Sequence, residues 1–457
     1  MIKLRPYQQQ AIDQIRQSMT SGNKRPLLVL PTGAGKTICF SYITQSAEQK
    51  NKRVMILVHR DSLFKQTSKT LSDFGVRHGL IGSGYKPNYG LSVQIAKVGT
   101  VVNRLDRFTP DLIIVDESHH CTAGQYVKII NAYPDARVIG VTATPIRTDG
   151  TGLDAMFDDI IIGATINELI DMGFLVAPRI FCPPSVVNTE GVKRSGGDFN
   201  RGELSELMDK PTITGDAVAH YKKLCDGVPA VAFCVSVKHA EHVAESFRAA
   251  GYRSECVHGA MKQDEIDRIL FELGSGLIDV VTSCDLISEG TDIPAIGCAI
   301  LLRPTMSLSL YLQQVGRALR LSAGKSEALI LDHVGNVNRH GHPCDEREWS
   351  LSGTKKKKKT KDDEPTVMAT ECESCYRVYR PTLGACPSCG FVKTAKSREI
   401  EIIEGDLIEI ERAELKKAMK KEVGRARTYD ELLKLEKERG YKKGWAWHRF
   451  NSRSNRK

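Results

Sequence analysis

The sequence predicts an α/β protein in which two doubly wound parallel sheets follow each other, with a small cysteine-containing module and a basic helical tail after them. Three observations support this fold class. Short apolar runs alternate with helix-length amphipathic segments in two separate stretches, as parallel strands and their crossover helices do. The chain has 457 residues, which is more than one core usually supports. After residue 345 the composition becomes rich in charge and cysteine.

The first stretch is organised around residues 27–37, LLVLPTGAGKT, where a buried strand runs into a glycine-rich loop and then a helix. Gly33 and Gly35 let the backbone approach an anion, so N–H groups at the helix start can bind phosphate oxygens. Lys36 can reach the β and γ phosphates, and Thr37 can hold Mg²⁺. The strict pattern has glycine where this chain has leucine, five residues before Gly35. The loop alone also fits an ordinary strand-to-helix turn.

A short apolar run at residues 112–115 ends in Asp116 and Glu117, which places this acidic pair at the same sheet edge as the loop. Asp116 can bind Mg²⁺, largely through water, and Glu117 can orient the water that attacks a γ-phosphate. A lone acidic pair at a strand end fits a solvated loop. Its combination with Lys36 and Thr37 favours catalysis instead.

The second stretch repeats the alternation of strands and helices but has no second phosphate loop. We expect strands at residues 230–235, 256–257 and 279–282, and helices at residues 238–250 and 263–273. Further on, Gln313, Arg317 and Arg320 are spaced four and three apart, which predicts a common helix face. The two arginines fit surface ion pairs, and they also fit arginine fingers that reach a γ-phosphate.

Together these segments resemble the ordered motifs of superfamily 2 helicases. The matching segments are Gln8 (Q motif) and residues 31–37 (I), 57–66 (Ia), 98–100 (Ib), 116–119 (II), 142–145 (III), 231–243 (IV), 288–292 (V) and 313–320 (VI). Within the superfamily the chain looks most like the DEAH-type DNA helicases and translocases grouped with type III restriction subunits and the XPB-like and UvrB-like proteins, many of them phage-borne. Ser118 stands where the DEAH signature has alanine, a small-for-small change.

The resemblance implies two RecA-like domains that hydrolyse ATP in the cleft between them and couple hydrolysis to movement on nucleic acid. It implies catalytic roles for Lys36, Asp116, Glu117, Gln313, Arg317 and Arg320. It implies ATP binding by Arg5, Gln8, Pro31, Thr32, Gly33, Ala34, Gly35, Lys36, Thr37, Gly290 and Asp292, and Mg²⁺ binding by Thr37 and Asp116. Thr142 and Thr144 would couple hydrolysis to strand movement.

The expected domain organisation has six parts. They are an ATP-binding domain at residues 1–163, a linker or insertion at 164–210, a helicase C-terminal domain at 211–345, a lysine-rich linker at 346–368, a zinc module at 369–395 and a basic helical and aromatic tail at 396–457.

The zinc module is predicted by two CxxC pairs, Cys372 with Cys375 and Cys386 with Cys389. The segment is too short to build a core, and four thiolates at this spacing are typical of tetrahedral structural Zn²⁺. Disulfides and a redox pair are the alternatives, and both are disfavoured in a cytosolic protein with two such pairs.

The tail ends in YKKGWAWHRFNSRSNRK, which interleaves aromatic and basic residues and contains no acidic residue. The aromatic rings can stack on bases while the cations follow phosphates. The alternative is a docking tail whose tryptophans pack on the helicase core. Both readings stay open from the sequence.

The partner is expected to be nucleic acid, and DNA in particular, whether single-stranded, forked or duplex. The formal net charge of +10 agrees with a polyanionic partner, and motif VI lacks the HRIGR form of DEAD-box RNA helicases. An RNA helicase and an ATP-switched clamp or loader that does not unwind are the alternatives. Replication or repair proteins are further expected partners.

No membrane contact is expected, because no stretch approaches the roughly 18 uninterrupted apolar residues of a membrane span, and the first residues lack an apolar signal-peptide core. We therefore expect a cytoplasmic protein of a bacterial or phage-infected host cell.

Overall fold

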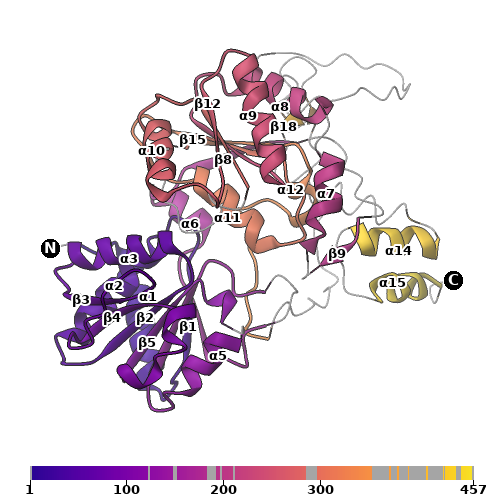
Figure 1. The fold of residues 1–457 in the computed structure, drawn as a ribbon. Coiled ribbons are helices and arrows are strands. Elements are labelled where there is room, and N and C mark those ends of the chain that lie inside the picture. The colour runs from indigo at the N-terminus through magenta and orange to yellow at the C-terminus, as the bar shows by residue number, and fades with distance from the viewer. Residues whose placement is uncertain are drawn as a thin grey trace. The chain divides into compact units, whose positions relative to one another are not determined.

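The computed structural model describes residues 3–121, 124–147, 152–182, 192–195, 198–208, 211–284, 296–352, 370–371, 378–379, 390, 408–409, 426, 428–438 and 444–454. The chain divides into two compact units (Figure 1). Unit 1 contains the residues up to 175 and also the later residues 346–352. Unit 2 contains most of the remainder. Each unit is built on a parallel sheet, so the predicted pair of α/β domains in tandem is confirmed.

Unit 1 is built on a seven-stranded sheet with the strand order β3-β4-β2-β5-β6-β1-β7. Its strands are β1 (Pro26–Val29), β2 (Val54–Val58), β3 (His78–Ile81), β4 (Val93–Lys97), β5 (Leu112–Asp116), β6 (Arg137–Thr142) and β7 (Asp159–Ile162). All six neighbouring pairs are parallel. The carboxyl ends of β1, β5 and β6, three adjacent strands, therefore meet at one edge.

Helices cover both faces of this sheet. They are α1 (Pro6–Thr20), α2 (Lys36–Glu48), α3 (Asp61–Asp73), α4 (Val98–Val101), α5 (Gly124–Asn131) and α6 (Ile166–Asp171). Alternate residues of one strand point to opposite faces, and Leu27 and Val29 of β1 pack in the same core cluster as Val101 of α4 and Ile129 of α5. Helices α1, α2 and α3 pack beside one another and form the second layer.

Residues 346–352 complete unit 1 although they follow unit 2 in the chain. Trp349 and Leu351 pack against the core of the first sheet. The carbonyl of Leu351 accepts the backbone N–H groups of Leu153 (2.6 Å) and Asp154 (3.1 Å). The chain therefore re-enters unit 1 and is held there by apolar packing and backbone hydrogen bonds.

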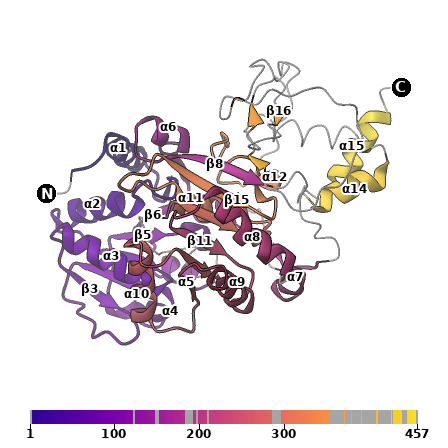
Figure 2. The same cartoon turned by 90° about the horizontal axis from the view of Figure 1, so that it is seen from above.

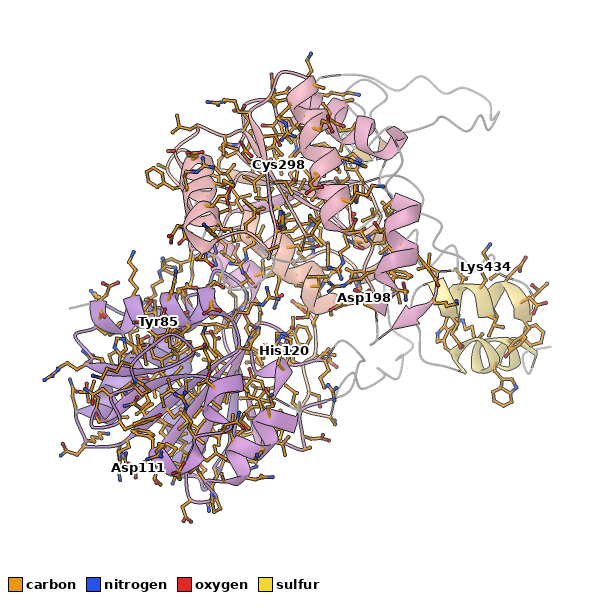
Figure 3. All side chains as sticks on the ribbon, viewed as in Figure 1. Tyr85, Asp111, His120, Asp198, Cys298 and Lys434 are labelled. Carbon is orange, nitrogen blue, oxygen red and sulfur yellow. The ribbon has the colours of Figure 1, made fainter. Side chains whose placement is uncertain are left out.

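Unit 2 has a second seven-stranded sheet, with the order β12-β13-β11-β14-β15-β8-β18. The strands are β8 (Ala177–Cys182), β11 (Ala230–Phe233), β12 (Ser254–Val257), β13 (Val280–Ser283), β14 (Cys298–Leu301), β15 (Glu327–Asp332) and β18 (Ile408–Glu409). The pairs are parallel except for β18, which runs antiparallel to β8. Cys298 of β14, in the sheet interior, is completely buried (Figure 3).

The helices of unit 2 beside this sheet are α7 (Arg201–Met208), α8 (Pro211–Leu224), α9 (Val237–Ala249), α10 (Gln263–Gly274), α11 (Leu308–Ala318) and α12 (Asn336–His340). A small hairpin, β9 (Arg194–Ser195) and β10 (Asp198–Phe199), is anchored by Asp198. The Asp198 carboxylate accepts hydrogen bonds from the Arg303 guanidinium (3.3 Å), the Thr305 hydroxyl (2.9 Å) and the Met306 backbone N–H (2.7 Å).

Two strands of this sheet differ from the sequence expectation. Strand β8 lies within residues 164–210, which we expected to form a linker or insertion and for which no strand was predicted. Residues 408–409 form the edge strand β18, so the helical prediction is wrong for them. In both cases the conformation is set by pairing with a strand distant in the sequence, which local periodicity does not report.

The described residues of the C-terminal region also include the short strands β16 (Thr370–Glu371) and β17 (Val378–Tyr379) and the helices α14 (Tyr429–Glu438) and α15 (Trp445–Ser454). The four predicted zinc ligands, at positions 372, 375, 386 and 389, lie outside the described residues. Among the residues with described positions, no helix has both the length and the apolar character needed to cross a membrane.

Candidate functional site

The glycine-rich loop connects β1 to α2 at the carboxyl edge of the first sheet. Gly33 and Gly35 have φ values of 88° and 79°, in the left-handed region that favours glycine. Gly35 is the N-cap residue of α2, which starts at Lys36. The first N–H groups of α2 therefore face the loop, and the loop and helix start together form an anion-binding arrangement.

Two side chains from α1 hold this loop. The Tyr7 hydroxyl (2.8 Å) and the Gln8 side-chain amide (3.1 Å) both donate to the carbonyl of Ala34. The Gln8 amide oxygen in turn accepts the N–H of Arg5 (3.0 Å), at the start of the helix. A Cβ on Gly35 would lie 2.5 Å from the Gln8 nitrogen, so the loop backbone and Gln8 are in close contact.

Phe174 and Tyr7 are two residues of this region that the sequence analysis did not select. The Arg5 guanidinium lies 4.4 Å from the centroid of the Phe174 ring, and the ring of Tyr7 lies 5.3 Å from it. Tyr7 could have been found from its place between Arg5 and Gln8. Phe174 is far away in the sequence and carries no local signal.

The acidic pair lies at the end of β5, which is separated from β1 by β6 alone. Asp116 and Glu117 are both buried, with exposed fractions of 3% and 8%. Glu117 adopts a left-handed conformation, with φ 48° and ψ 55°, and its N–H donates to the Asp116 carboxylate (2.9 Å). Such a conformation is strained for a residue with a side chain, and strained residues concentrate at functional sites.

The electrostatics of the pair call for a cation. Burial, and then the neighbouring charge of Glu117, raise the pKa of Asp116 to about 7, although Lys36 opposes this shift. Two adjacent buried carboxylates are therefore undercompensated by the protein alone. A divalent cation at Asp116 would supply the missing positive charge, so these residues fit the predicted Mg²⁺.

Thr142, at the end of β6, connects the loop to the acidic pair. Its carbonyl accepts the N–H of Leu30 (3.0 Å), at the start of the loop. Its hydroxyl lies 3.3 Å from Nδ1 of His119, and the same nitrogen lies 3.5 Å from the Glu117 carboxylate. His119 is thus a positioning residue that the sequence analysis left without a role, although it stands inside motif II.

The hydroxyl of Ser118 has a structural role. It lies 2.8 Å from the carbonyl of Val115 and 3.0 Å from that of Val141, on the adjacent strands β5 and β6. The serine is fully buried. Alanine at this position would lack these contacts, so the change is more than a replacement of one small side chain by another.

Two further histidines surround His119. The ring of His120 lies 4.1 Å from that of His119 and 4.7 Å from that of His59, which follows β2 (Figure 3 labels His120). The charge of His59 also lowers the pKa of Asp116. His120, the residue after motif II, therefore contacts both His119 of motif II and His59 of motif Ia.

In unit 2, Gln313 and Arg317 lie on α11 and are almost completely buried. Arg320 lies two residues beyond the end of this helix, so the prediction of one helix face for all three residues is wrong. Carbonyls at and just beyond the end of the helix have partners outside it. Lys325 Nζ donates to the carbonyls of Ala318 and Arg320 (2.7 Å to the latter), and the N–H of Val176 donates to Leu319 (2.9 Å).

Lys325 was not selected from the sequence, yet it fixes the chain around Arg320. Its ammonium also donates to the carbonyl of Ile296 (2.7 Å). Burial, together with the nearby charge of Arg320, lowers the pKa of Lys325 to about 8, and burial lowers that of Arg320 to about 10. Gly290 and Asp292, the predicted motif V residues, lie outside the described residues.

Comparisons with known proteins agree with this arrangement. Residues 1–147 match the family model of the type III restriction enzyme res subunit, and residues 217–322 match the helicase conserved C-terminal domain. A 51.5 kDa protein of a Lactococcus phage is 34% identical over 86% of this chain and 84% of its own length. The chain belongs to the superfamily 2 helicases, in the group related to the type III restriction subunit.

Two further proteins are similar to this chain, one in sequence and one in fold. A Saccharomyces cerevisiae protein named for an ATP-dependent helicase, IRC3, is 32% identical, and the match spans 73% of this chain and 51% of the yeast protein. A fragment of an HsdR subunit of a type I restriction enzyme from Vibrio vulnificus has the same fold, with a TM-score of 0.59, 23% identity and coverage of 74% of this chain and 66% of the fragment. The chain thus spans about half of the yeast relative.

The hydrogen bond from Gln8 to the loop yields a first prediction. Gln8→Glu keeps an oxygen that accepts the Arg5 N–H but removes the N–H that donates to Ala34. A carboxylate would then face a carbonyl, so the loop should loosen and the Kd for ATP should rise by about tenfold, which corresponds to roughly 1.4 kcal/mol. Gln10→Glu, the same change at an exposed position of α1, is the control. Equal Kd values for both variants and wild type would contradict the role of Gln8.

The buried carboxylate of Asp116 yields a second prediction. Its pKa is about 7 in the folded protein and near 3.8 in an exposed carboxyl. As pH rises, the unfolded chain therefore loses the Asp116 proton before the folded protein does. The free energy of unfolding consequently falls as pH rises from about 4 to about 7. Asp116→Asn should raise the Tm of the metal-free protein by several degrees at pH 8, and by less at pH 5.5. Asp106→Asn, with a 75% exposed side chain, should change neither Tm.

Proposed function

We propose that the protein is an ATP-dependent DNA helicase or translocase, which hydrolyses ATP and couples hydrolysis to movement on nucleic acid. One observation carries this proposal. The glycine-rich loop, the acidic pair and Thr142 end three adjacent strands and are joined by hydrogen bonds or short contacts from Leu30 through Thr142 and His119 to Glu117. These contacts connect the proposed phosphate site to the carboxylate proposed to activate water.

Each residue near the phosphate site has a proposed role in the reaction. The N–H groups of the loop and of the start of α2, with the Lys36 ammonium, bind the β and γ phosphates. Glu117 orients the attacking water and accepts its proton. When bound by Thr37 and Asp116, Mg²⁺ would neutralise phosphate charge. Arg5 and Gln8 bind the adenine side of the nucleotide.

The arginines of unit 2 complete the proposed ATPase. Arg317 and Arg320 supply positive charge to the γ-phosphate in the transition state, a contribution of about 10³-fold or more in NTPases with arginine fingers. Gln313 orients the attacking water or the γ-phosphate, and Gly290 and Asp292 line the nucleotide. An interaction that depends on the γ-phosphate is lost on hydrolysis, which gives each ATP cycle two conformational states.

DNA is the proposed substrate because the first family model is that of a restriction enzyme subunit and because motif VI lacks the RNA helicase form. An RNA helicase and an ATP-switched clamp or loader are the competing functions. Cys372, Cys375, Cys386 and Cys389 are proposed to hold a structural Zn²⁺.

The zinc proposal is tested by metal analysis of the full chain. Purified protein should contain about one zinc per chain, and Cys386→Ser should lose most of it because three thiolates bind the ion more weakly. Cys256→Ser, a change at a half-buried free cysteine of β12, should keep the full content. Absence of zinc from the wild-type chain purified without chelators would refute the site.

The motor proposal is tested by steady-state ATP hydrolysis with no nucleic acid, single-stranded DNA, duplex DNA, forked DNA or RNA. DNA should raise the rate by tenfold or more, and Glu117→Gln should lower the stimulated rate by about 10²-fold or more because the general base is lost. Glu245→Gln, at an exposed position of α9, is the matched control.

The same assays separate the alternatives. Stimulation by RNA alone would favour the RNA helicase, and a rate that no nucleic acid changes would favour the ATP-switched clamp. If DNA stimulates hydrolysis, displacement of a triplex strand without separation of the duplex would identify a translocase.

A further inference from the structure

The two C-terminal helices α14 and α15 form a hairpin with its own small apolar core. The helices lie side by side in both views (Figures 1 and 2). Leu432 and Leu435 of α14 pack with Ala446 of α15, and Trp445 packs against this cluster. Of the two tryptophans of α15, Trp445 thus packs against this core and Trp447 is not part of it.

Glu436 sets the orientation of α15. Its side chain is buried, and its carboxylate accepts the backbone N–H groups of Gly444 (3.2 Å) and Ala446 (2.6 Å) at the start of the helix. A carboxylate at a helix N-terminus is electrostatically favourable. With the helix start held in this way, Trp445 and Ala446 face α14 and the residues on the other side of α15 face outward.

Three aromatic side chains remain exposed on the hairpin, and we call them the aromatic face. Trp447 is 54% exposed and Phe450, three residues further along the same side of α15, is 38% exposed. Tyr429 at the start of α14 is 37% exposed, and its ring lies edge-on to Phe450 at 5.9 Å. Neighbouring exposed rings of this size indicate an interaction surface.

The charge of the sequence that contains α15 favours one kind of partner. From position 439 to the last residue the chain has no acidic residue and seven basic ones, namely Arg439, Lys442, Lys443, Arg449, Arg453, Arg456 and Lys457. Lys434 adds a further cation on α14 (Figure 3). Asp430 and Glu431 are exposed beside Tyr429, so the positive charge belongs to α15 and the sequence around it. Exposed aromatic rings on a basic helix complement a ligand that carries flat rings along a polyanionic backbone, which describes single-stranded nucleic acid.

We propose that the aromatic face of the α14–α15 hairpin is a second nucleic-acid site, separate from the ATPase motifs, that binds a single strand by stacking bases on Trp447 and Phe450. Arg449, on the same helix as both rings, supplies positive charge to the phosphates. Stacking is tolerant of sequence, so the site binds whichever strand the motor meets. The inference concerns binding and needs no ATP turnover, so it can be tested independently of the proposed motor.

The test measures binding of labelled oligonucleotides of about 20 nucleotides, oligo-dT and oligo-rU, to the full chain by fluorescence anisotropy. The double variant Trp447→Ala, Phe450→Ala should raise the Kd by about tenfold or more for the strand that binds. The single variant Trp447→Tyr, which keeps an aromatic ring, should retain most of the wild-type affinity. The control is Phe271→Ala, which removes a 73% exposed phenylalanine on α10. Comparison of the two oligonucleotides tells whether the site takes DNA, RNA or both.

Tryptophan fluorescence gives a second measurement that a folding defect does not imitate. The chain has three tryptophans, and only Trp447 lies on the aromatic face, so oligo-dT should quench the wild type and quench Trp447→Phe much less. Equal affinity and equal quenching in the variants and the wild type would overturn the proposal and assign the surface to a protein contact. Loss of DNA-stimulated ATPase with quenching retained would refute the motor and leave this site standing.

Discussion

The functional half of unit 1 depends on the orientation of one peptide group, between Ala34 and Gly35. The carbonyl of Ala34 is held by the Tyr7 hydroxyl and the Gln8 amide. Because the carbonyl and the N–H of a trans peptide point in opposite directions, the N–H of Gly35 is turned away from these two side chains of α1. Left-handed glycines on either side of Ala34 make this orientation sterically accessible.

Hydrogen bonds to the backbone also fix the conformation of the acidic pair. Glu117 stays in a strained conformation because Asp116 accepts its N–H, and Ser118 holds the next residue between β5 and β6. Thr142 then reaches Leu30 with its carbonyl and His119 with its hydroxyl. Three contacts, Leu30 to Thr142, Thr142 to His119 and His119 to Glu117, therefore link the glycine-rich loop to the carboxylate proposed to activate water.

Unit 2 positions its arginines by a different device. Arg320 lies beyond the end of α11, where Lys325 and the N–H of Val176 bind the backbone carbonyls of residues 318–320. Lys325 donates three hydrogen bonds in a half-buried site, and burial lowers its pKa to about 8. The burial of such a cation is tolerated because each ammonium proton has a carbonyl partner.

The sequence by itself determined the two-sheet fold, the phosphate loop and the acidic pair, because each depends on local features: apolar strands, glycines at turn positions and charged residues at strand ends. It also placed Gln8, Arg317 and Thr142 in ordered motifs. Only the tertiary structure decided that Phe174 lies against Arg5, that Trp349 packs in the core of unit 1, that residues 408–409 join the second sheet and that Lys325 binds the carbonyls at the end of α11. These contacts join residues far apart in the chain, or oppose a local helical tendency with a stronger non-local partner, and no periodicity in the sequence encodes them.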